Sequence, residues 1–279
     1  MTIKNTLQGM FKFVVNAVLL LFSASCIFPI LWMVNSALKT SNEFMQNSMS
    51  LTTHPYFQNF IDAVQSSGFL ECFLNSAILG FINVVLTVIC ALVAGFFISR
   101  YNFRFKKAVY LLFVSGMVIP MLSLLIPVFL QFKALGMLDH RWTLILPYLA
   151  FSLPFAVMLT ENYIRTIPVE LDEAAYMEGC STFKLLTKII FPMCSPITAI
   201  IVITSFMNAW NEFPFSLVLI NDKSLRTISI AIRMFNSEHA INYPLYMAAL
   251  LVSILPILII YLIFSKQIMK GMTVGAVKG

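Results

Sequence analysis

Charged side chains are scarce in this sequence. Only 11% of its 279 residues are Asp, Glu, Lys or Arg, whereas 59% are hydrophobic, and a soluble domain usually carries about 25% charged residues. The 26 Phe and 16 Met supply more apolar side chain than a soluble fold of this length covers with polar surface. The composition therefore excludes an ordinary soluble domain and predicts an integral membrane protein.

Motifs for catalysis and metal binding are also missing. The five cysteines are odd in number and have no C-x-x-C spacing, which argues against a disulfide framework or a metal site. The three histidines lie far apart, and there is no H-E-x-x-H, no Walker A motif and no nucleophile elbow. We therefore predict that the chain is not an enzyme and binds no metal or cofactor directly, so that energy for uphill work must come from another protein.

Long uncharged runs predict how the chain crosses the membrane. Inside a bilayer every backbone amide must be paired within a helix or a closed barrel, and continuous rather than alternating apolar runs favour helices. A span needs roughly 20 mostly apolar residues. We predict an all-α bundle of six transmembrane helices, at 13–35, 71–99, 107–132, 142–163, 185–219 and 243–265. Pro214 is expected to end or kink the fifth helix near its far end.

The distribution of Lys and Arg predicts the orientation. With six spans both termini share one side, and twelve of the 18 Lys and Arg residues fall on that side. The positive-inside rule then places both termini in the cytoplasm. This bias accounts for the formal charge of +6 without a nucleic-acid-binding surface. We therefore expect the chain to contact lipid and not nucleic acid. The apolar run after Lys12 is too long for a cleaved signal peptide and predicts a retained first helix.

A short capped helix is predicted in the cytoplasmic loop between the fourth and fifth spans. Pro168 suits a first helical turn, and the acidic residues at 170, 172 and 173 favour the positive end of the helix dipole. Gly179 can take the left-handed conformation that closes a helix. The helix is too short to be stable alone. Its small, mostly apolar face should dock in a groove on another protein and is formed by Leu171, Ala174, Ala175 and Glu178.

This loop resembles the EAA motif of bacterial ABC importer permeases. Glu173-Ala174-Ala175 is followed after three residues by Gly179, and after nine more by IIFP at 189–192. The family spacing is E-A-A, three residues, G, nine residues, I-x-L-P. Glu178 stands where Asp is usual and Phe191 where Leu is usual, and neither departure changes charge or apolarity. The resemblance implies that these residues couple the chain to an ATPase: Glu170, Leu171, Glu173, Ala174, Ala175, Met177, Glu178, Gly179 and Pro192.

Softer motifs are similar to the carbohydrate (maltose-type) branch of that family. They are GMLD at 136–139, LIL at 144–146, LPF at 153–155, AWNEF at 209–213 and KGMTVGAVKG at 270–279. Together, in this order, they favour a permease for a sugar or oligosaccharide. The chain then divides into a first transmembrane helix with an external loop (1–70), a permease core (71–266) with the EAA loop at 167–192, and a cytoplasmic tail (267–279).

The resemblance also implies an assembly in the bacterial cytoplasmic (inner) membrane. Such permeases pair with a second, related permease, usually as a heterodimer. Two copies of a cytosolic ATPase clamp the EAA loops and hold the ATP and Mg²⁺, while an external binding protein delivers the sugar. Transport would proceed by alternating access, with the EAA helix acting as a lever.

Polar residues within or near the spans are candidates for the pathway or a gate. They are Asn75, Asn83, Asn208, Trp210, Asn211 and Glu212. The last four are expected near the outer interface. There they either anchor the chain, as Trp and polar groups often do at that depth, or form an external gate or a contact with the binding protein. Asn75 and Asn83 either contact substrate or simply bond neighbouring helices.

A secondary transporter or channel without an ATPase partner is the alternative function. Such a protein more often places a charge deep in a span for ion coupling. The middle of each predicted span contains no charged residue, which argues against this alternative.

Overall fold

The computed structural model describes residues 2–66, 68–235 and 242–276, with side chains for 10–66, 68–235 and 242–267. Within these ranges all regular secondary structure is helical. The chain divides into two compact units, Met1–Ser66 with Met234–Ser253 and Ser67–Arg233 with Ile254–Gly279. His239 and the last three residues of the predicted tail, 277–279, lie outside the described residues.

The first unit is built from the N-terminal helix and the loop that follows it. It contains α1 (Thr2–Ala37), α2 (Ser41–Gln46), α3 (Gln58–Gln65) and the first part of α14 (Tyr243–Ala276). α1 is long and apolar enough to cross a membrane over Met10–Ala37. α14 meets the same test, and its helix continues into the predicted tail as far as Ala276.

A buried lysine organises the loop after α1. The Lys39 ammonium donates to the backbone oxygens of Asn47 at 2.8 Å and Ser48 at 3.2 Å, and its side chain is fully buried. The Asn59 amide donates to the backbone oxygens of Ala37 and Lys39, both at 2.8 Å. The bond from Asn59 to Ala37 satisfies a carbonyl that the C-terminus of α1 leaves free. The other bonds join parts of the loop to one another, so the loop has a folded structure.

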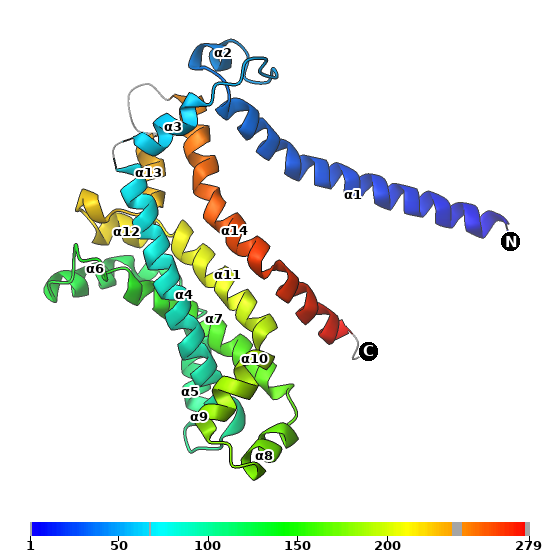
Figure 1. Cartoon of the computed structure of the whole chain (residues 1–279), viewed down its shortest axis with the longest axis vertical. Helices are drawn as coiled ribbons and strands as arrows, with labels where there is room; N and C mark the ends of the chain where they lie inside the picture. The colour runs from blue at the N-terminus through cyan, green and yellow to red at the C-terminus, as the bar shows by residue number, and fades with distance from the viewer. Residues whose placement is uncertain (1, 67, 236–241, 277–279) are drawn as a thin grey trace. The chain divides into compact units, whose positions relative to one another are not determined.

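Three long helices form the body of the second unit. α4 (Phe69–Arg100), α7 (Ile145–Arg165) and α11 (Ser195–Asn211) pack side by side, with α4 against both of the others (Figure 1). Asn83 in α4 lies where they meet, and its amide donates to Ser152 Oγ of α7 and to the Ser205 backbone oxygen of α11, both at 3.2 Å. These bonds satisfy the amide N–H groups of Asn83, whose burial in apolar surroundings would otherwise be costly, whereas its Oδ1 has no hydrogen-bond partner among the described residues.

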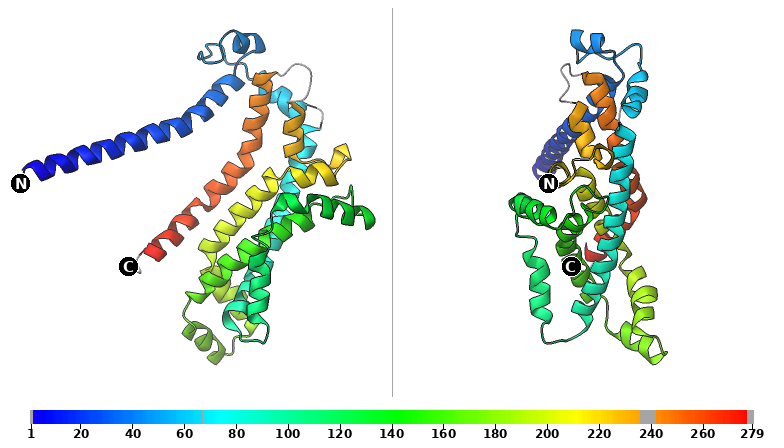
Figure 2. Two further views of the ribbon diagram at one scale, coloured as in Figure 1. Left: turned by 180° about the vertical axis from the view of Figure 1, so that it is seen from behind. Right: turned by 90° about the vertical axis from the view of Figure 1, so that its left-hand side faces the viewer.

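The third predicted span is broken. The structure has α5 (Lys106–Ser115), a turn, the 3₁₀-helix η1 (Met121–Leu124) and α6 (Leu125–Ala134) in its place. Figure 2 shows that α6 does not continue α5 in a line. Pro120 lacks a backbone N–H and disfavours helical geometry at the residue before it. Counting charges cannot detect such a break, because the whole stretch remains apolar.

The fifth predicted span is divided as well. Its segments are α9 (Thr182–Lys184), the π-helix η2 (Leu185–Ile190), α10 (Phe191–Met193), α11 and α12 (Pro214–Leu219). The part before Cys194 and α11 meet at an angle of 79°. Pro192 cannot donate a backbone hydrogen bond, which favours a break close to it. The expectation that Pro214 interrupts the helix is confirmed, since α11 ends at Asn211 and Pro214 begins α12.

Six spans are therefore not confirmed by the described residues. Four helices are long and apolar enough to cross a membrane, or five if the bent pair counts as one span. The spans predicted at 13–35, 71–99, 142–163 and 243–265 correspond to α1, α4, α7 and α14. The fold is all-α, as predicted, with two predicted spans replaced by shorter helices.

Two loops of the second unit are joined by one aspartate. Asp139 has φ 56°, and its carboxylate accepts hydrogen bonds from the backbone N–H groups of Asn221 and Asp222. Partial burial raises the pKa of Asp139, but those N–H donors lower it more, so that the pKa lies below its usual value. The GMLD motif at 136–139 therefore has a local structural role between α6 and α7.

Gly95 permits the closest approach of α4 to α7. A Cβ at this position would lie 2.7 Å from Thr160 Cγ2 and 3.0 Å from the backbone nitrogen of Glu161. We expect Gly95→Ala to destabilise the folded chain by about 1–3 kcal/mol, because backbone cannot move aside as a side chain can. The check is the midpoint of thermal unfolding in detergent. Gly80→Ala is the matched variant, since its Cβ would meet only the Phe206 ring; an equal effect at both positions would contradict this explanation.

Candidate functional site: the short helix α8 and a cavity in the helical bundle

A short helix lies inside the predicted EAA loop. α8 (Glu170–Met177) has acidic residues in its first turn, and Gly179 just beyond its end has φ 78°. The Gly179 N–H donates to the Tyr176 oxygen at 3.0 Å and the Cys180 N–H to the Ala175 oxygen at 2.9 Å. This is the Schellman pattern of a helix end, so the expected left-handed glycine is confirmed.

One side of α8 packs on the chain's own core and the other is open. Ala175 is 6% exposed and contacts the buried cluster that includes Ile167, Leu185 and Ile190. Met177 is 89% exposed and Leu171 is 41% exposed. Ala175 therefore does not share the outward face on which the sequence analysis placed it. We call the nine residues to which the EAA resemblance assigns coupling the EAA set. Its exposed members on α8 and just after it are Glu170, Leu171, Glu173, Ala174, Met177, Glu178 and Gly179.

α8 is tied to the end of α4 by residues that the sequence analysis did not select. Arg100, the last residue of α4, forms an ion pair with Asp172 at 2.7 Å. Figures 1 and 2 show α8 at the same end of the second unit as the end of α4. The hydroxyls of Tyr101 and Tyr176 lie 3.1 Å apart. The sequence shows only that Arg100 ends a long uncharged run and that Asp172 precedes the EAA triplet. Neither fact indicates that the two residues form an ion pair.

The chain leaves α8 through a capped turn and enters the bent segment. Ser181 Oγ accepts from the Lys184 N–H at 3.4 Å and caps α9. Pro192, the last residue of the EAA set, is exposed and lies two residues before the 79° bend at Cys194. The EAA loop is therefore connected to α11 through a π-helix and a bend rather than through a straight helix.

A cavity of about 410 Å³ lies within the second unit, between α7, α11 and α12. Its wall combines aromatic rings, thioethers and amides, which suits a ligand with both apolar and hydroxyl-bearing faces. The lining residues are Met121, Pro147, Tyr148, Phe151, Ser152, Met207, Asn208, Ala209, Asn211, Glu212, Pro214 and Phe215. Among the described residues no group of three His, Cys, Asp or Glu side chains could hold a metal ion.

The candidate pathway residues at the end of α11 separate into two kinds. Asn208 and Asn211 are exposed and line the cavity. Glu212 also lines it, but its carboxylate is occupied by hydrogen bonds from the Tyr148 hydroxyl at 3.0 Å and the Phe215 N–H at 2.6 Å. Glu212 therefore starts α12 and fixes Tyr148 in the cavity wall, whereas the two amides face the open space.

The other candidates hold helices together. Trp210 is 3% exposed and packs on the Phe206 ring at 5.4 Å and the Phe73 ring at 5.3 Å, so it joins α11 to α4 rather than facing an interface. Asn83 is fully buried at the crossing of the three long helices. Asn75 donates to the backbone oxygens of Ser224 and Arg226 and so anchors the loop at 224–226.

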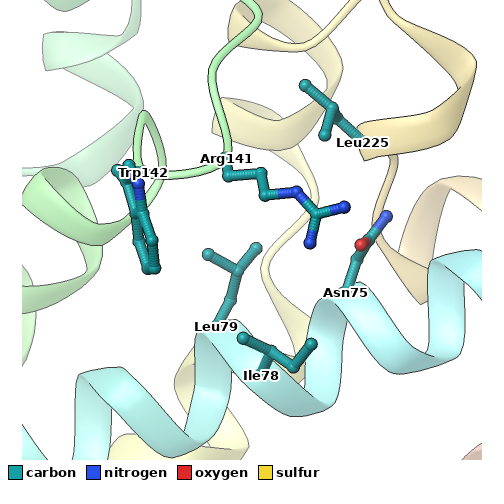
Figure 3. A pocket seen from close by; sticks show the side chains of 6 residues that line it. All are labelled: Asn75, Ile78, Leu79, Arg141, Trp142 and Leu225. Carbon is teal, nitrogen blue, oxygen red and sulfur yellow. The ribbon is translucent and has the colours of Figure 1, made fainter.

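Asn75 also lines a smaller pocket of about 100 Å³. Figure 3 shows Arg141 extending across it toward Asn75 and Leu225, with Trp142 on its other side. Ile78 and Leu79 of α4 complete the pocket wall. Its volume holds little more than a few water molecules, so the larger cavity is the better candidate for a ligand.

Comparison with known proteins places these features in a family. Residues 77–274 match the model of the binding-protein-dependent transport system inner membrane component. The probable ABC transporter permease protein YurM of Bacillus subtilis (strain 168) is 34% identical over 94% of this chain and 87% of its own length. The melibiose/raffinose/stachyose import permease protein MelC of the same organism is 33% identical over 80% of this chain and 81% of its own.

A solved structure shares the fold. The chain is similar to one in a bacterial ABC transporter that imports the acidic polysaccharide alginate, with a TM-score of 0.80 and 21% identity over 95% of this chain and 98% of that chain. The family model covers most of the sequence and includes both α8 and the cavity. The chain therefore belongs to the family of inner-membrane components of binding-protein-dependent ABC transport systems, and it is a transport subunit rather than an enzyme.

Proposed function

We propose that this chain is the membrane-spanning subunit of an ATP-driven importer for a sugar or oligosaccharide, and that α8 is its coupling helix. The observation that carries the proposal is the geometry of α8. It presents Leu171 and Met177 outward while Ala175 anchors it inward. An exposed apolar face on a helix of eight residues is unfavourable in water, which argues for a protein groove that covers it.

A sugar is the substrate class that the cavity supports best. Phe151 offers aromatic surface for the apolar face of a sugar ring, and Asn208 and Asn211 offer amide donors and acceptors for hydroxyl groups. The name of MelC, which imports melibiose, raffinose and stachyose, supports the same class. The side-chain amides of Asn208 and Asn211 would then form hydrogen bonds with particular hydroxyl groups of the sugar and so discriminate between sugars.

The proposed assembly follows from the family. We place beside this chain a second, related permease, two copies of a cytosolic ATPase that hold ATP and Mg²⁺, and an external sugar-binding protein. Both termini and α8 lie on the cytoplasmic side, and the six-span topology requires the segment of α5, η1 and α6 to complete one crossing within the assembly. The excess of Lys and Arg on that side supports this orientation.

The mechanism makes α8 a lever. Closure of the ATPase dimer moves the groove that holds Leu171 and Met177, and the helix moves with it. The bundle then alternates between two arrangements that open the 410 Å³ cavity to one side or the other. Such a transition needs only that ATP binding favours one arrangement over the other.

The secondary-transporter alternative gains no support from the buried carboxylates of the described residues. Glu161 in α7 is paired with Arg165 one turn later, and Glu212 is occupied by Tyr148 and backbone N–H groups. Asp172, the third buried carboxylate of the described residues, is paired with Arg100. All three side chains therefore have structural partners, and none is a free carboxylate poised for ion coupling.

Co-purification tests the assembly directly. The tagged chain, extracted in mild detergent from its native membranes, is expected to bring down a second permease and an ATPase with a Walker motif, identified by mass spectrometry. Met177→Asp should release the ATPase and retain the permease, because it places a charge on the exposed apolar face. Recovery of the intact wild-type chain alone would overturn the ATP-driven assembly.

Gly179→Ala tests whether the end of α8 must be left-handed. No atom lies within 4 Å of a Cβ built there, so the cost is purely conformational, about 1–2 kcal/mol. We expect normal insertion and ATPase binding but less sugar transported per ATP hydrolysed in proteoliposomes. Gly179→Asn should lose less, because Asn tolerates positive φ. Equal transport by Gly179→Ala and wild type would contradict the role of this turn.

Asn208→Ala tests the cavity. Loss of one hydrogen bond to a sugar, about 1–1.5 kcal/mol, should raise the KM for uptake roughly tenfold without releasing the ATPase. The matched control is Asn16→Ala, an exposed position of α1 that does not line the cavity. If both variants transport with the wild-type KM, this cavity is not where the sugar binds.

A further inference from the structure

We propose that Arg100 and Asp172 are positioning residues that join the coupling helix to α4, so that a movement of α8 is transmitted through α4 as well as through the linker to α11. This inference rests on the proposed function of α8. It concerns residues that lie outside the EAA set, 72 positions apart in the sequence.

The ion pair has the geometry of a joint between three segments. Arg100 Nε lies 2.7 Å from Asp172 Oδ2, and Nη2 lies 3.5 Å from Oδ1. Nη2 also donates to the Ile167 backbone oxygen at 2.9 Å, in the link between α7 and α8. The Nε–H is not aligned for a directed hydrogen bond to Asp172, so the short contact is mainly electrostatic. One guanidinium thus connects the end of α4, the α7–α8 link and α8.

Burial makes this pair different from an ordinary surface ion pair. Each side chain is only 8% exposed, and an ion pair screened from water interacts more strongly than an exposed one. Removal of either partner leaves the other charge buried and uncompensated. A lysine would not reproduce this arrangement, because its ammonium lacks the rigid planar set of donors with which the guanidinium reaches both the carboxylate and a backbone oxygen.

A second contact lies beside the ion pair. The Tyr101 hydroxyl lies 3.1 Å from the Tyr176 hydroxyl, and Thr182 Oγ1 lies 3.3 Å from Tyr176 and 3.5 Å from Tyr101. Tyr101 follows Arg100 directly, and Tyr176 lies one turn after Asp172 on α8. Both ends of the coupling helix are therefore held to the same end of α4.

α4 is the stiffer of the two routes away from α8. It is a single helix of 32 residues with no proline. At its middle Asn83 is bonded to α7 and α11, and toward its far end Asn75 is bonded to the loop at 224–226. The linker route contains the π-helix η2 and the 79° bend. A displacement of α8 would be partly absorbed at the bend, whereas α4 would carry it to the outer half of the bundle.

Limited proteolysis tests whether the pair holds α8 in place. The full chain in mild detergent is digested with a glutamyl endopeptidase, which cuts after Glu170, Glu173 and Glu178. Arg100→Gln and Asp172→Asn should each be cut at least about fivefold faster than wild type, because local opening of α8 becomes easier. Arg104→Gln is the matched control, since Arg104 is exposed and contacts only the Phe105 ring in the described structure. Unchanged cleavage in the first two variants would overturn the proposal.

Transport measurements test whether the pair transmits movement. In proteoliposomes containing the whole importer, the sugar transported per ATP hydrolysed should fall about tenfold in either single variant and remain normal in Arg104→Gln. The charge-swapped pair Arg100→Asp with Asp172→Arg should recover part of the loss, because it restores opposite charges at the two positions. Single variants with wild-type coupling, or a swapped pair no better than the singles, would exclude the positioning role.

The two measurements separate this inference from the proposed function. Proteolysis reports on the pair in the chain itself and requires no transport. If the wild-type importer showed no ATP-dependent sugar uptake, the proposed function and the transmission role would both be wrong, whatever the proteolysis showed. If wild-type uptake were normal and the variants were indistinguishable from it, only this inference would be wrong.

Discussion

The second unit depends on the contact between α4 and α7. With only a hydrogen at Gly95, the helices approach until Thr160 and the backbone of Glu161 meet α4 directly. At this separation Asn83 reaches Ser152 on α7 and the backbone of α11, and Arg100 reaches both the α7–α8 link and Asp172. Small residues allow such approach in membrane helices, where packing and interhelical hydrogen bonds replace the hydrophobic effect as the driving force.

The long helices could be predicted because charge marks their ends. Glu71 and Arg100 bracket α4, and the uncharged run between them agrees with the observed helix within a few residues. The third and fifth predicted spans could not be obtained in this way. Their breaks come from backbone chemistry near Pro120 and Pro192, where the apolar pattern is uninterrupted. The positions of charged residues indicate which segments can lie in an apolar environment. They do not indicate where a proline removes a backbone hydrogen bond and interrupts a helix.

The candidate site was predictable where it depends on local sequence. The acidic start of α8 and the left-handed Gly179 follow from neighbouring residues. The orientation of α8 does not, because the helical spacing that groups Ala175 with Leu171 also groups it with Asp172, and only the tertiary contact decides which side is buried. In the same way Trp210 and Asn211 are the last two residues of α11, and their different directions from the helix axis place one in the core and the other toward the cavity.

The charge around α8 limits the kind of protein surface to which the helix can bind. Among residues 166–183 there is no Lys or Arg, and of the four acidic residues only Asp172 has a cationic partner in the described structure. Glu170, Glu173 and Glu178 therefore surround the exposed Leu171 and Met177 with negative charge. A groove with an apolar floor and a basic rim matches this surface, because complementary charge guides encounter and apolar burial supplies the affinity. Since Arg100 is paired with Asp172, the exposed carboxylates of Glu170, Glu173 and Glu178 are the acidic groups of this loop that the proposed partner would meet.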